Sequence, residues 1–208
     1  MRKPRPPKNK RNPNQWADHY TRRAHKDKFA ARSVYKLQEI QKRFRIIRRG
    51  GRVLDLGCAP GSWTQYAARL TGPEGAVIGI DLKKIDIALP GHARLLQGDI
   101  LAPNEAMAAE LAPGFHAIIS DMAPATTGHR DVDAARSFNL CEAALSIART
   151  HLLPGGHFVC KIFQGPDFEV FVRQVREAFT SQRIYKPQSS RKASREIFII
   201  GRGKKQEA

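Results

Sequence analysis

The chain has 208 residues, 41% of them hydrophobic, which is enough for one globular domain with tails. Its formal net charge of +17 is uneven: residues 1–52 carry 18 Lys and Arg against 3 Asp and Glu, residues 53–182 carry 10 against 14, and residues 183–208 carry 8 against 2. Basic ends on a mildly acidic body predict a polyanionic partner. Nucleic acid is favoured over a membrane surface or a merely solubilising tail, because the basic tail has no apolar face of the membrane-binding kind.

The cysteines and histidines give no sign of a metal site. Cys58, Cys141 and Cys160 are far apart and form no CxxC pair, and the seven histidines lack metal-ligand spacing. There is no signal peptide and no apolar run of membrane-spanning length. We therefore expect a cytoplasmic protein with reduced thiols, no metal and no membrane association.

The N-terminal region divides into a tail and a helix. Residues 1–28 are predicted to form a basic, largely disordered tail, since the first fifteen are rich in Pro, Asn, Lys and Arg. From Phe29 to Phe44 the apolar residues recur at helical spacing with Arg and Lys between them, which predicts a basic amphipathic helix. A domain over residues 29–202 and a C-terminal tail over 203–208 complete the predicted organisation.

From residue 52 onward, predicted strands and helices alternate. Helices are expected around 63–70 and over 103–111, 133–152 and 167–180; strands are expected over 52–57, 76–82, 93–99, 115–122, 157–163, 183–187 and 195–201. This alternation predicts an α/β, Rossmann-like fold: a mainly parallel seven-stranded sheet with helices on both faces. The loop before the last strand is too short for a crossover helix, so that strand is predicted to be antiparallel.

Four carboxylates are predicted at or near the carboxyl ends of the first four strands, the edge at which open α/β sheets bind ligands. Asp55 precedes a Gly57-to-Gly61 turn, and Asp81, Asp99 and Asp121 close the next three strands. Each aspartate alone could be a helix N-cap. Together they suit a ribose, an adenine amino group and a sulfonium-bearing amino acid, which predicts S-adenosylmethionine. The G-x-x-x-G spacing differs from G-x-G-x-x-G and disfavours an NAD-dependent oxidoreductase.

Three further charged residues occupy unusual contexts. Lys161 lies within the apolar strand FVCKIF, where a lysine needs a partner, and the candidate is Asp121 on the neighbouring strand end. A salt bridge explains this placement, but a partly desolvated lysine at the ligand edge is also a candidate base. Glu196 shares a strand face with Phe198, whereas Lys36 by itself reads as a solvated helix lysine.

Several segments together resemble one family, the FtsJ-type methyltransferases that modify a ribose 2′-hydroxyl in large-subunit ribosomal RNA. The similarity spans residues from about 31 to 202, and the combination of KPxSSRxxSRE with KxFQG is highly specific. One small departure is CAPGS, where the family usually has AAPGG. The matching segments are RSVYKLQEI, VLDLGCAPGSWTQY, LLQGD, SDMAPATTG, LLPGGHFVCKIFQG and KPQSSRKASREIFIIG, with the strand end at Asp81.

The resemblance implies a class I S-adenosylmethionine-dependent methyltransferase with a Lys-Asp-Lys-Glu catalytic tetrad. Lys161 would take the proton of the 2′-hydroxyl, Lys36 would hold the substrate ribose, and the two carboxylates would orient the lysines. The catalytic set is then Lys36, Asp121, Lys161 and Glu196, and the implied cofactor contacts are Gly61, Trp63, Asp81, Asp99 and Asp121. A core role for Trp63 is an equally good interpretation.

The resemblance also implies a substrate. It favours a uridine of ribosomal RNA, within the large ribosomal subunit, modified by a monomeric enzyme that supports ribosome assembly. Transfer RNA or a messenger cap is an alternative target, because the same tetrad would serve each of them. A non-catalytic RNA-binding assembly factor is a further alternative, and the filled tetrad argues against it.

Overall fold

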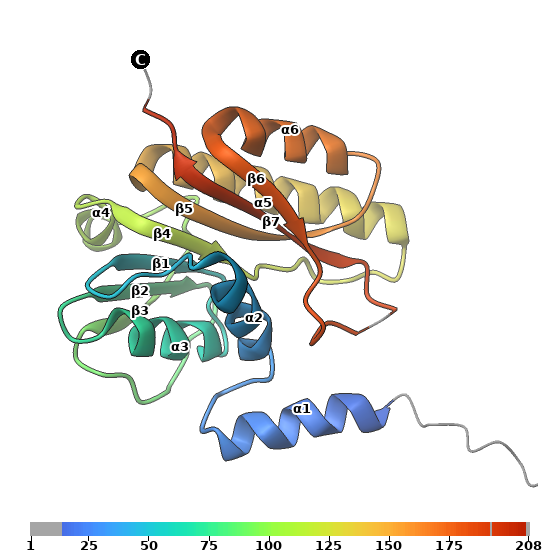
Figure 1. The fold of residues 1–208 in the computed structure, drawn as a ribbon, viewed down its shortest axis with the longest axis horizontal. Coiled ribbons are helices and arrows are strands. Elements are labelled where there is room, and N and C mark those ends of the chain that lie inside the picture. The colour runs from blue at the N-terminus through green and yellow to red at the C-terminus, as the bar shows by residue number, and fades with distance from the viewer. Residues whose placement is uncertain (1–13, 192, 207–208) are drawn as a thin grey trace, which may run out of the picture.

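The computed structural model describes residues 14–191 and 193–206, and its central feature is a seven-stranded sheet (Figure 1). The strand order is β3-β2-β1-β4-β5-β7-β6. The strands are β1 (Arg52–Leu56), β2 (Ala76–Asp81), β3 (Ala93–Gln97), β4 (Phe115–Ser120), β5 (Leu152–Phe163), β6 (Phe179–Tyr185) and β7 (Glu196–Lys204).

Strands β1 to β5 pair in parallel, whereas β7 runs antiparallel to both of its neighbours, β5 and β6. This confirms the predicted mainly parallel sheet with an antiparallel last strand. The register places Lys161 opposite Phe198 and His157 opposite Arg202. Because β7 is inserted between β5 and β6, its first residue, Glu196, lies at the same edge as the end of β5.

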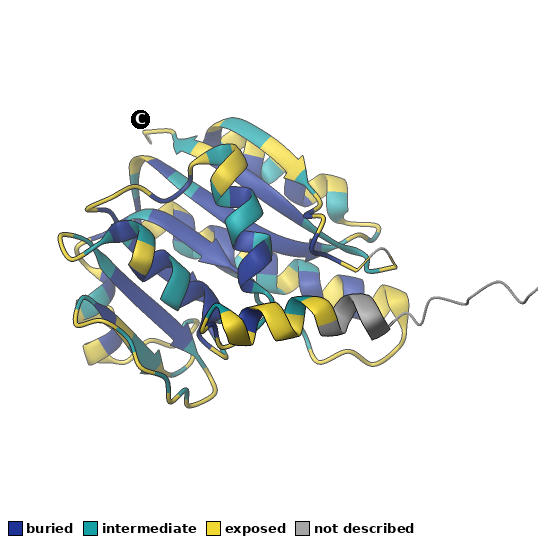
Figure 2. Cartoon of the chain, turned by 60° about the horizontal axis from the view of Figure 1, so that its bottom comes forward, coloured by how far each residue is buried: buried dark blue, intermediate teal, exposed yellow. Residues whose placement is uncertain are grey.

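The helices cover both faces of the sheet (Figures 1 and 2). Buried residues of α2 and α3 pack on the face that carries Val53 and Ile119, and those of α4, α5 and α6 pack on the face that carries Leu54 and Ile118. No described helix is long and apolar enough to cross a lipid bilayer. The helices are α1 (Asn14–Lys26), α2 (Val34–Phe44), α3 (Ser62–Thr71), α4 (Glu105–Leu111), α5 (Arg130–His151) and α6 (Phe168–Ala178).

The N-terminal region is more ordered than the sequence predicts. Residues 14–26 of the expected disordered tail form α1, because Ala24 and Phe29 find an apolar surface with Val34 and Tyr35. Residues 1–13 lie outside the described part of the chain. The helix predicted over 29–44 starts only at Val34, since the amide of Phe29 turns back to the carbonyl of Ala24.

The C-terminal boundary of the domain also differs slightly from the predicted one. The expected C-terminal tail begins at residue 203, but β7 continues to Lys204, and the amide of Lys205 bonds to the carbonyl of Ala178. The Nζ of Lys204 donates to the carbonyl of Leu152 at 2.9 Å. These backbone and side-chain bonds continue the sheet past the boundary that apolar patterning suggests.

Gly79, in the middle of β2, provides a test of the packing between the sheet and α3. A Cβ at this position would lie 2.8 Å from Leu95 Cδ2 and 2.9 Å from both Cys58 Sγ and Thr64 Oγ1. We expect Gly79→Ala to lower the free energy of unfolding by about 1–3 kcal/mol, the usual cost of overpacking a core, as measured by urea denaturation. Gly91→Ala is the matched control, since nothing lies within 4 Å of that position. Equal midpoints for the two variants would contradict this description of the core.

Candidate active site

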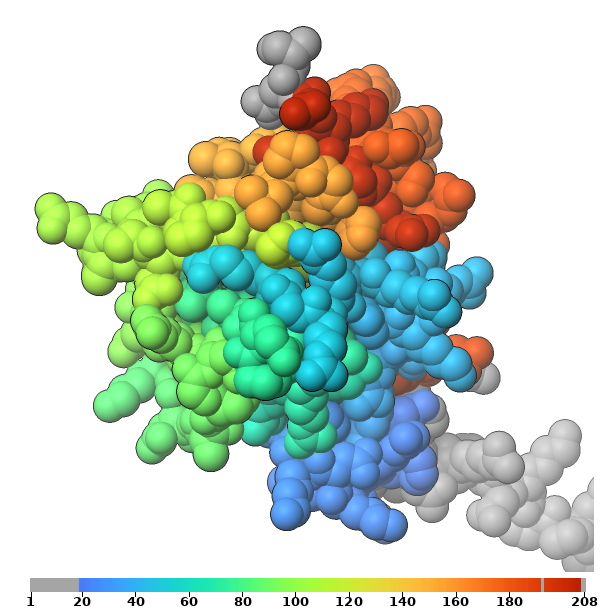
Figure 3. Space-filling view, turned by 60° about the vertical axis from the view of Figure 1, so that its left-hand side comes forward, coloured from blue at the N-terminus to red at the C-terminus, as the bar shows by residue number. Residues whose placement is uncertain are grey.

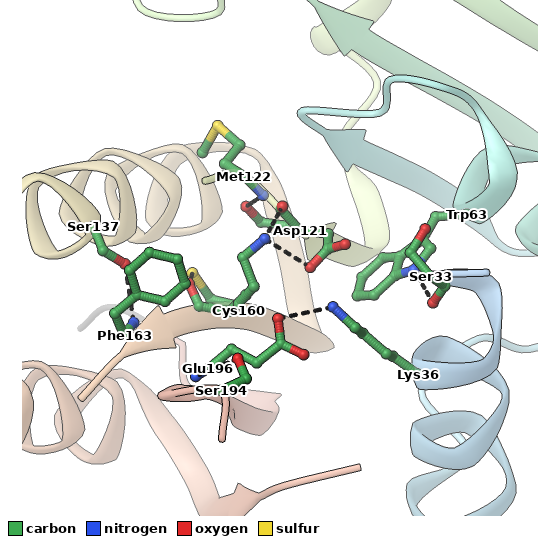
Figure 4. Close-up of polar contacts among 12 residues, drawn as sticks. Ser33, Lys36, Trp63, Asp121, Met122, Ser137, Cys160, Phe163, Ser194 and Glu196 are labelled. Carbon is green, nitrogen blue, oxygen red and sulfur yellow. Dashed lines mark hydrogen bonds and ion pairs between the residues drawn. The ribbon is translucent and has the colours of Figure 1, made fainter. Parts of the chain in front are cut away.

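Two ion pairs lie side by side at one edge of the sheet (Figure 4). The Nζ of Lys161, on β5, lies 3.0 Å from Oδ1 of Asp121, just after β4, and it also donates to the Asp121 carbonyl. The Nζ of Lys36, on α2, lies 2.9 Å from Oε2 of Glu196, at the start of β7. The Lys161 side chain is 6% exposed, so its ammonium or amine group is nearly removed from bulk water.

The sheet register explains why these pairs meet. Ser120 pairs with Cys160, which brings the following residues, Asp121 and Lys161, together at the carboxyl ends of two parallel strands. Phe163 pairs with Glu196 on the antiparallel β7, so this glutamate enters the same region from the opposite chain direction. The structure therefore brings together all four residues of the expected tetrad.

Glu196 is ionised in this environment. Burial acts to raise its pKa, but the charge of Lys36, the hydrogen bond from Lys36 and the charge of Lys161 outweigh burial and leave the pKa below its ordinary value. The charges of both lysines thus act on the Glu196 carboxylate. Its negative charge therefore offsets part of the repulsion between Lys36 and Lys161.

A cleft of about 460 Å³ lies at the ends of β1, β2, β3 and β4 and adjoins the ion pair of Lys161 through Asp121. Oδ2 of Asp81 accepts from the amide of Ala59 and Oδ1 from that of Lys83, both at 2.9 Å. Oδ1 of Asp99 accepts from the amide of Leu101 at 2.9 Å. The cleft walls combine polar and apolar residues, among them Gly57, Asp81, Asp99, Leu101, Asp121, Met122 and Leu140.

Three of the five expected cofactor contacts, Asp81, Asp99 and Asp121, line the cleft, but Gly61 and Trp63 do not. Gly61 is covered by the loop after β2, and a Cβ there would lie 2.1 Å from Ile87 Cδ1. The indole Nε1 of Trp63 donates to the carbonyl of Ser33 at 2.9 Å, and its ring stacks on Phe198 at 5.8 Å between centroids. Trp63 thus supports the surface beneath Lys36, as a core residue would.

Asp55 is a fully buried carboxylate behind the cleft. Its Oδ2 accepts from the hydroxyl of Thr64 at 2.7 Å, while its Oδ1 has no hydrogen-bond partner among the described residues. Burial raises the pKa of Asp55 to about 7; the Thr64 hydroxyl opposes the shift, and the charges of Asp121 and Asp81 add to it. Proton binding at Asp55 is therefore linked to folding and to the charge of anything that enters the cleft.

Glu39 is a structural partner of the site that the sequence analysis missed. Its carboxylate accepts from the hydroxyl of Tyr185 at 3.1 Å and from the amides of Gln188 and Ser189 at 2.7 and 2.8 Å. Glu39 follows Lys36 by one helical turn, so it ties α2 to the loop that leads into Glu196. No local pattern could reveal this, because its partners are about 150 residues away along the chain.

Replacing the buried carboxyl of Asp55 with an amide provides a test of its raised pKa. Between the unfolded value near 3.8 and the folded value of about 7, the folded state binds the extra proton, so stability falls as the pH rises. We expect Asp55→Asn to gain stability relative to the unchanged protein as the pH increases from 5 to 8, followed by calorimetry. A gap that stays constant over this range would show that Asp55 titrates normally.

The chain is similar in sequence to known methyltransferases. The model of the FtsJ-like methyltransferase family matches residues 29–204. The chain is 59% identical over 192 residues to Ribosomal RNA large subunit methyltransferase E of Desulforapulum autotrophicum, covering 92% of this chain and 95% of that protein. A protein of the same name from Desulfatibacillum aliphaticivorans is 51% identical over 196 residues, covering 94% of this chain and 95% of that protein.

A solved structure from Plasmodium falciparum, described as a ribosomal RNA methyltransferase, has the same fold. Its TM-score is 0.75 at 24% sequence identity, over 86% of this chain and all of that one. At this level of identity the likeness concerns the fold alone. The family model, by contrast, spans nearly all of the described domain. The two relatives are identical to this chain at half or more of the aligned residues. The chain is a member of the FtsJ-like methyltransferase family.

Proposed function

We propose that this chain transfers the methyl group of S-adenosylmethionine to a ribose 2′-hydroxyl, that of a uridine, in large-subunit ribosomal RNA. The observation that carries the proposal is the pair of lysine–carboxylate contacts, one of which includes Asp121, a residue that also lines the cleft. The curated relatives, named ribosomal RNA large subunit methyltransferase E, support the choice of RNA. We further propose that the protein acts in the cytoplasm, as a monomer, on RNA within the large subunit.

The cleft suits a cationic nucleoside. Its carboxylates would attract a ligand that carries a sulfonium and an ammonium group, and its apolar residues would cover the face of an adenine ring. Asp81 would accept from the ribose hydroxyls and Asp99 from the adenine amino group, since each carboxylate oxygen can accept more than one hydrogen bond. When bound, S-adenosylmethionine supplies an electrophilic methyl group.

Asp55 and Asp121 would face the amino-acid end of this cofactor. Asp55 has an oxygen that no described residue contacts by a hydrogen bond, and a cation near it would favour its ionised form. Gly61 and Trp63 would contribute indirectly, because the first is covered by Ile87 and the second stacks on Phe198. The same Asp121 borders the cleft and pairs with Lys161, so it would hold the base next to the methyl donor.

For this reaction the chain would have to align the ribose hydroxyl with the methyl group and remove one proton. Lys161, in its neutral form, would accept the proton of the 2′-hydroxyl at Nζ as the oxygen bonds to the methyl carbon and the bond from carbon to sulfur breaks. Asp121 would then stabilise the ammonium that forms. Lys36, held by Glu196, would donate to the substrate ribose and fix its orientation.

Substitution of Lys161 tests the proposed base. We expect Lys161→Ala to lower turnover by about 100-fold to 10,000-fold, the usual contribution of a general base, while binding of S-adenosylmethionine stays nearly intact. Methyl transfer to large-subunit RNA and calorimetric binding would be measured together. Lys161→Arg is the control, because arginine keeps the charge beside Asp121 but cannot serve as a base. Joint loss of turnover and binding in the alanine variant would identify Lys161 as a structural residue.

Substitution of Asp99 tests the proposed adenine contact. We expect Asp99→Ala to weaken binding of S-adenosylmethionine about tenfold, equivalent to the loss of about one hydrogen bond, with little change in turnover at saturating cofactor. Asp86→Ala is the matched control, because Asp86 lies in the loop after β2 and is not among the residues that line the cleft. If the Asp86 variant bound the cofactor as weakly as the Asp99 variant, the assignment would be wrong.

A further inference from the structure

Five exposed arginines, which the proposed reaction does not use, converge on the face of the sheet that α2 covers. We call this group the arginine surface. The first lies near the end of α2, two follow in the segment that leads to β1, and one each comes from β6 and β7. In chain order they are Arg43, Arg45, Arg48, Arg183 and Arg202. In Figure 3 the blue atoms around residues 40–50 adjoin the orange and red atoms of the C-terminal strands.

The first half of this surface is continuous through Tyr185. The guanidinium carbon of Arg43 lies 5.3 Å from the centroid of the Tyr185 ring. Tyr185 and Arg183 are two residues apart on β6, so their side chains project from the same face. Arg183 pairs with Ile200, which makes Arg202 its diagonal neighbour on β7, about 7–8 Å away.

The second half is continuous through His157, which pairs with Arg202. Burial lowers the pKa of His157, and the charges of Arg202 and Arg48 lower it further, against a hydrogen bond that the ring donates to the backbone of Gly156. Arg48 and Arg202 therefore act on the same imidazole. The Nδ1 of His157 accepts from the amide of Gly203 at 3.2 Å, which keeps the ring neutral toward both arginines.

The positive charge of this surface is not neutralised by the described residues. None of the ion pairs in the described part of the chain involves one of the five arginines. Glu39, which contacts Tyr185, brings one negative charge to this region against the five positive charges of the arginines. Five like charges on one surface repel each other, and an anionic partner would relieve that repulsion.

The far end of the arginine surface, at Arg202, is remote from the reacting lysine. Lys161 lies opposite Phe198, and Arg202 lies four residues further along β7, about 13 Å at the usual rise per residue. Glu196 is six residues from Arg202, or about 20 Å by the same measure. A nucleotide whose ribose lies at Lys161 cannot at the same time contact Arg202.

We propose that the arginine surface binds the phosphate backbone of a second RNA segment, separate from the segment whose ribose is methylated. The inference rests on the proposed function and extends it. Guanidinium groups bind phosphate oxygens through paired hydrogen bonds, and a folded ribosomal RNA presents several backbone segments at once. A contact of this kind would select a large folded substrate over a short strand.

The test is the salt dependence of RNA binding by the double variant Arg183→Gln/Arg202→Gln. Retention of protein-free large-subunit RNA on filters would be measured from about 0.05 to 0.3 M KCl. We expect the plot of log affinity against log salt to be less steep by about 1.4–1.8, since each lost phosphate contact contributes about 0.7–0.9 to the slope. Affinity at the lowest salt should fall at least tenfold.

The control is Arg173→Gln/Arg176→Gln, which removes the same charge from α6 on the opposite face of the sheet. An equal slope for the two double variants would overturn the proposal. So would a loss of affinity for intact subunits but not for protein-free RNA, because the contact would then be to ribosomal protein. The filter assay measures RNA binding and does not depend on methyl transfer. If the unchanged protein transferred no methyl group, the proposed function would be wrong, but the salt slopes would still test the arginine surface.

Discussion

A lysine that is almost excluded from water can remain among apolar strands only with a carboxylate beside it, and Lys161 meets this requirement through Asp121. Breaking a buried pair by removing one partner typically costs about 3–5 kcal/mol, because a charge is left uncompensated. The pair is therefore a constraint that the ends of β4 and β5 must satisfy together. The second pair, between Lys36 and Glu196, adds α2 and β7 to the same constraint. Four elements far apart in sequence are held at one edge of the sheet by two contacts of about 3 Å.

The fold provides this arrangement with few special features. Insertion of β7 between β5 and β6 brings Glu196 to the carboxyl end of β5, where a parallel strand would have placed its other end. Glu39 then fixes the loop before β7 to the helix that carries Lys36, through two hydrogen bonds from loop amides, and a third bond joins it to Tyr185 at the end of β6. Asp121 belongs both to the cleft and to the first ion pair, so a ligand in the cleft and Lys161 would share one carboxylate. Through this one side chain, Asp121 would link the position of a ligand in the cleft to the position of Lys161.

Much of the fold could be predicted from the sequence, because strand and helix periodicities are local signals. The parallel sheet and its antiparallel last strand followed from alternation and from one short loop. The grouping of Asp81, Asp99 and Asp121 around one cleft was predictable, because the carboxyl ends of parallel strands lie at the same edge of a sheet. Lys36 needed the family resemblance, since nothing local distinguishes it from a solvated helix lysine. Three features depend on contacts between distant segments, which no local pattern contains: the role of Glu39, the order of residues 14–26 and the burial of Trp63 against Phe198.

As proposed, the site at Lys161 acts on a ribose hydroxyl of large-subunit RNA. The most direct measurement is transfer of a labelled methyl group from S-adenosylmethionine to large subunits isolated from a strain that lacks this gene, followed by alkaline hydrolysis of the RNA. Methylation of a 2′-hydroxyl protects the adjacent phosphodiester, so the account predicts that the label appears in one alkali-resistant dinucleotide that contains uridine. Label released in single nucleotides, as from a methylated base, or no label in large-subunit RNA at all, would contradict it.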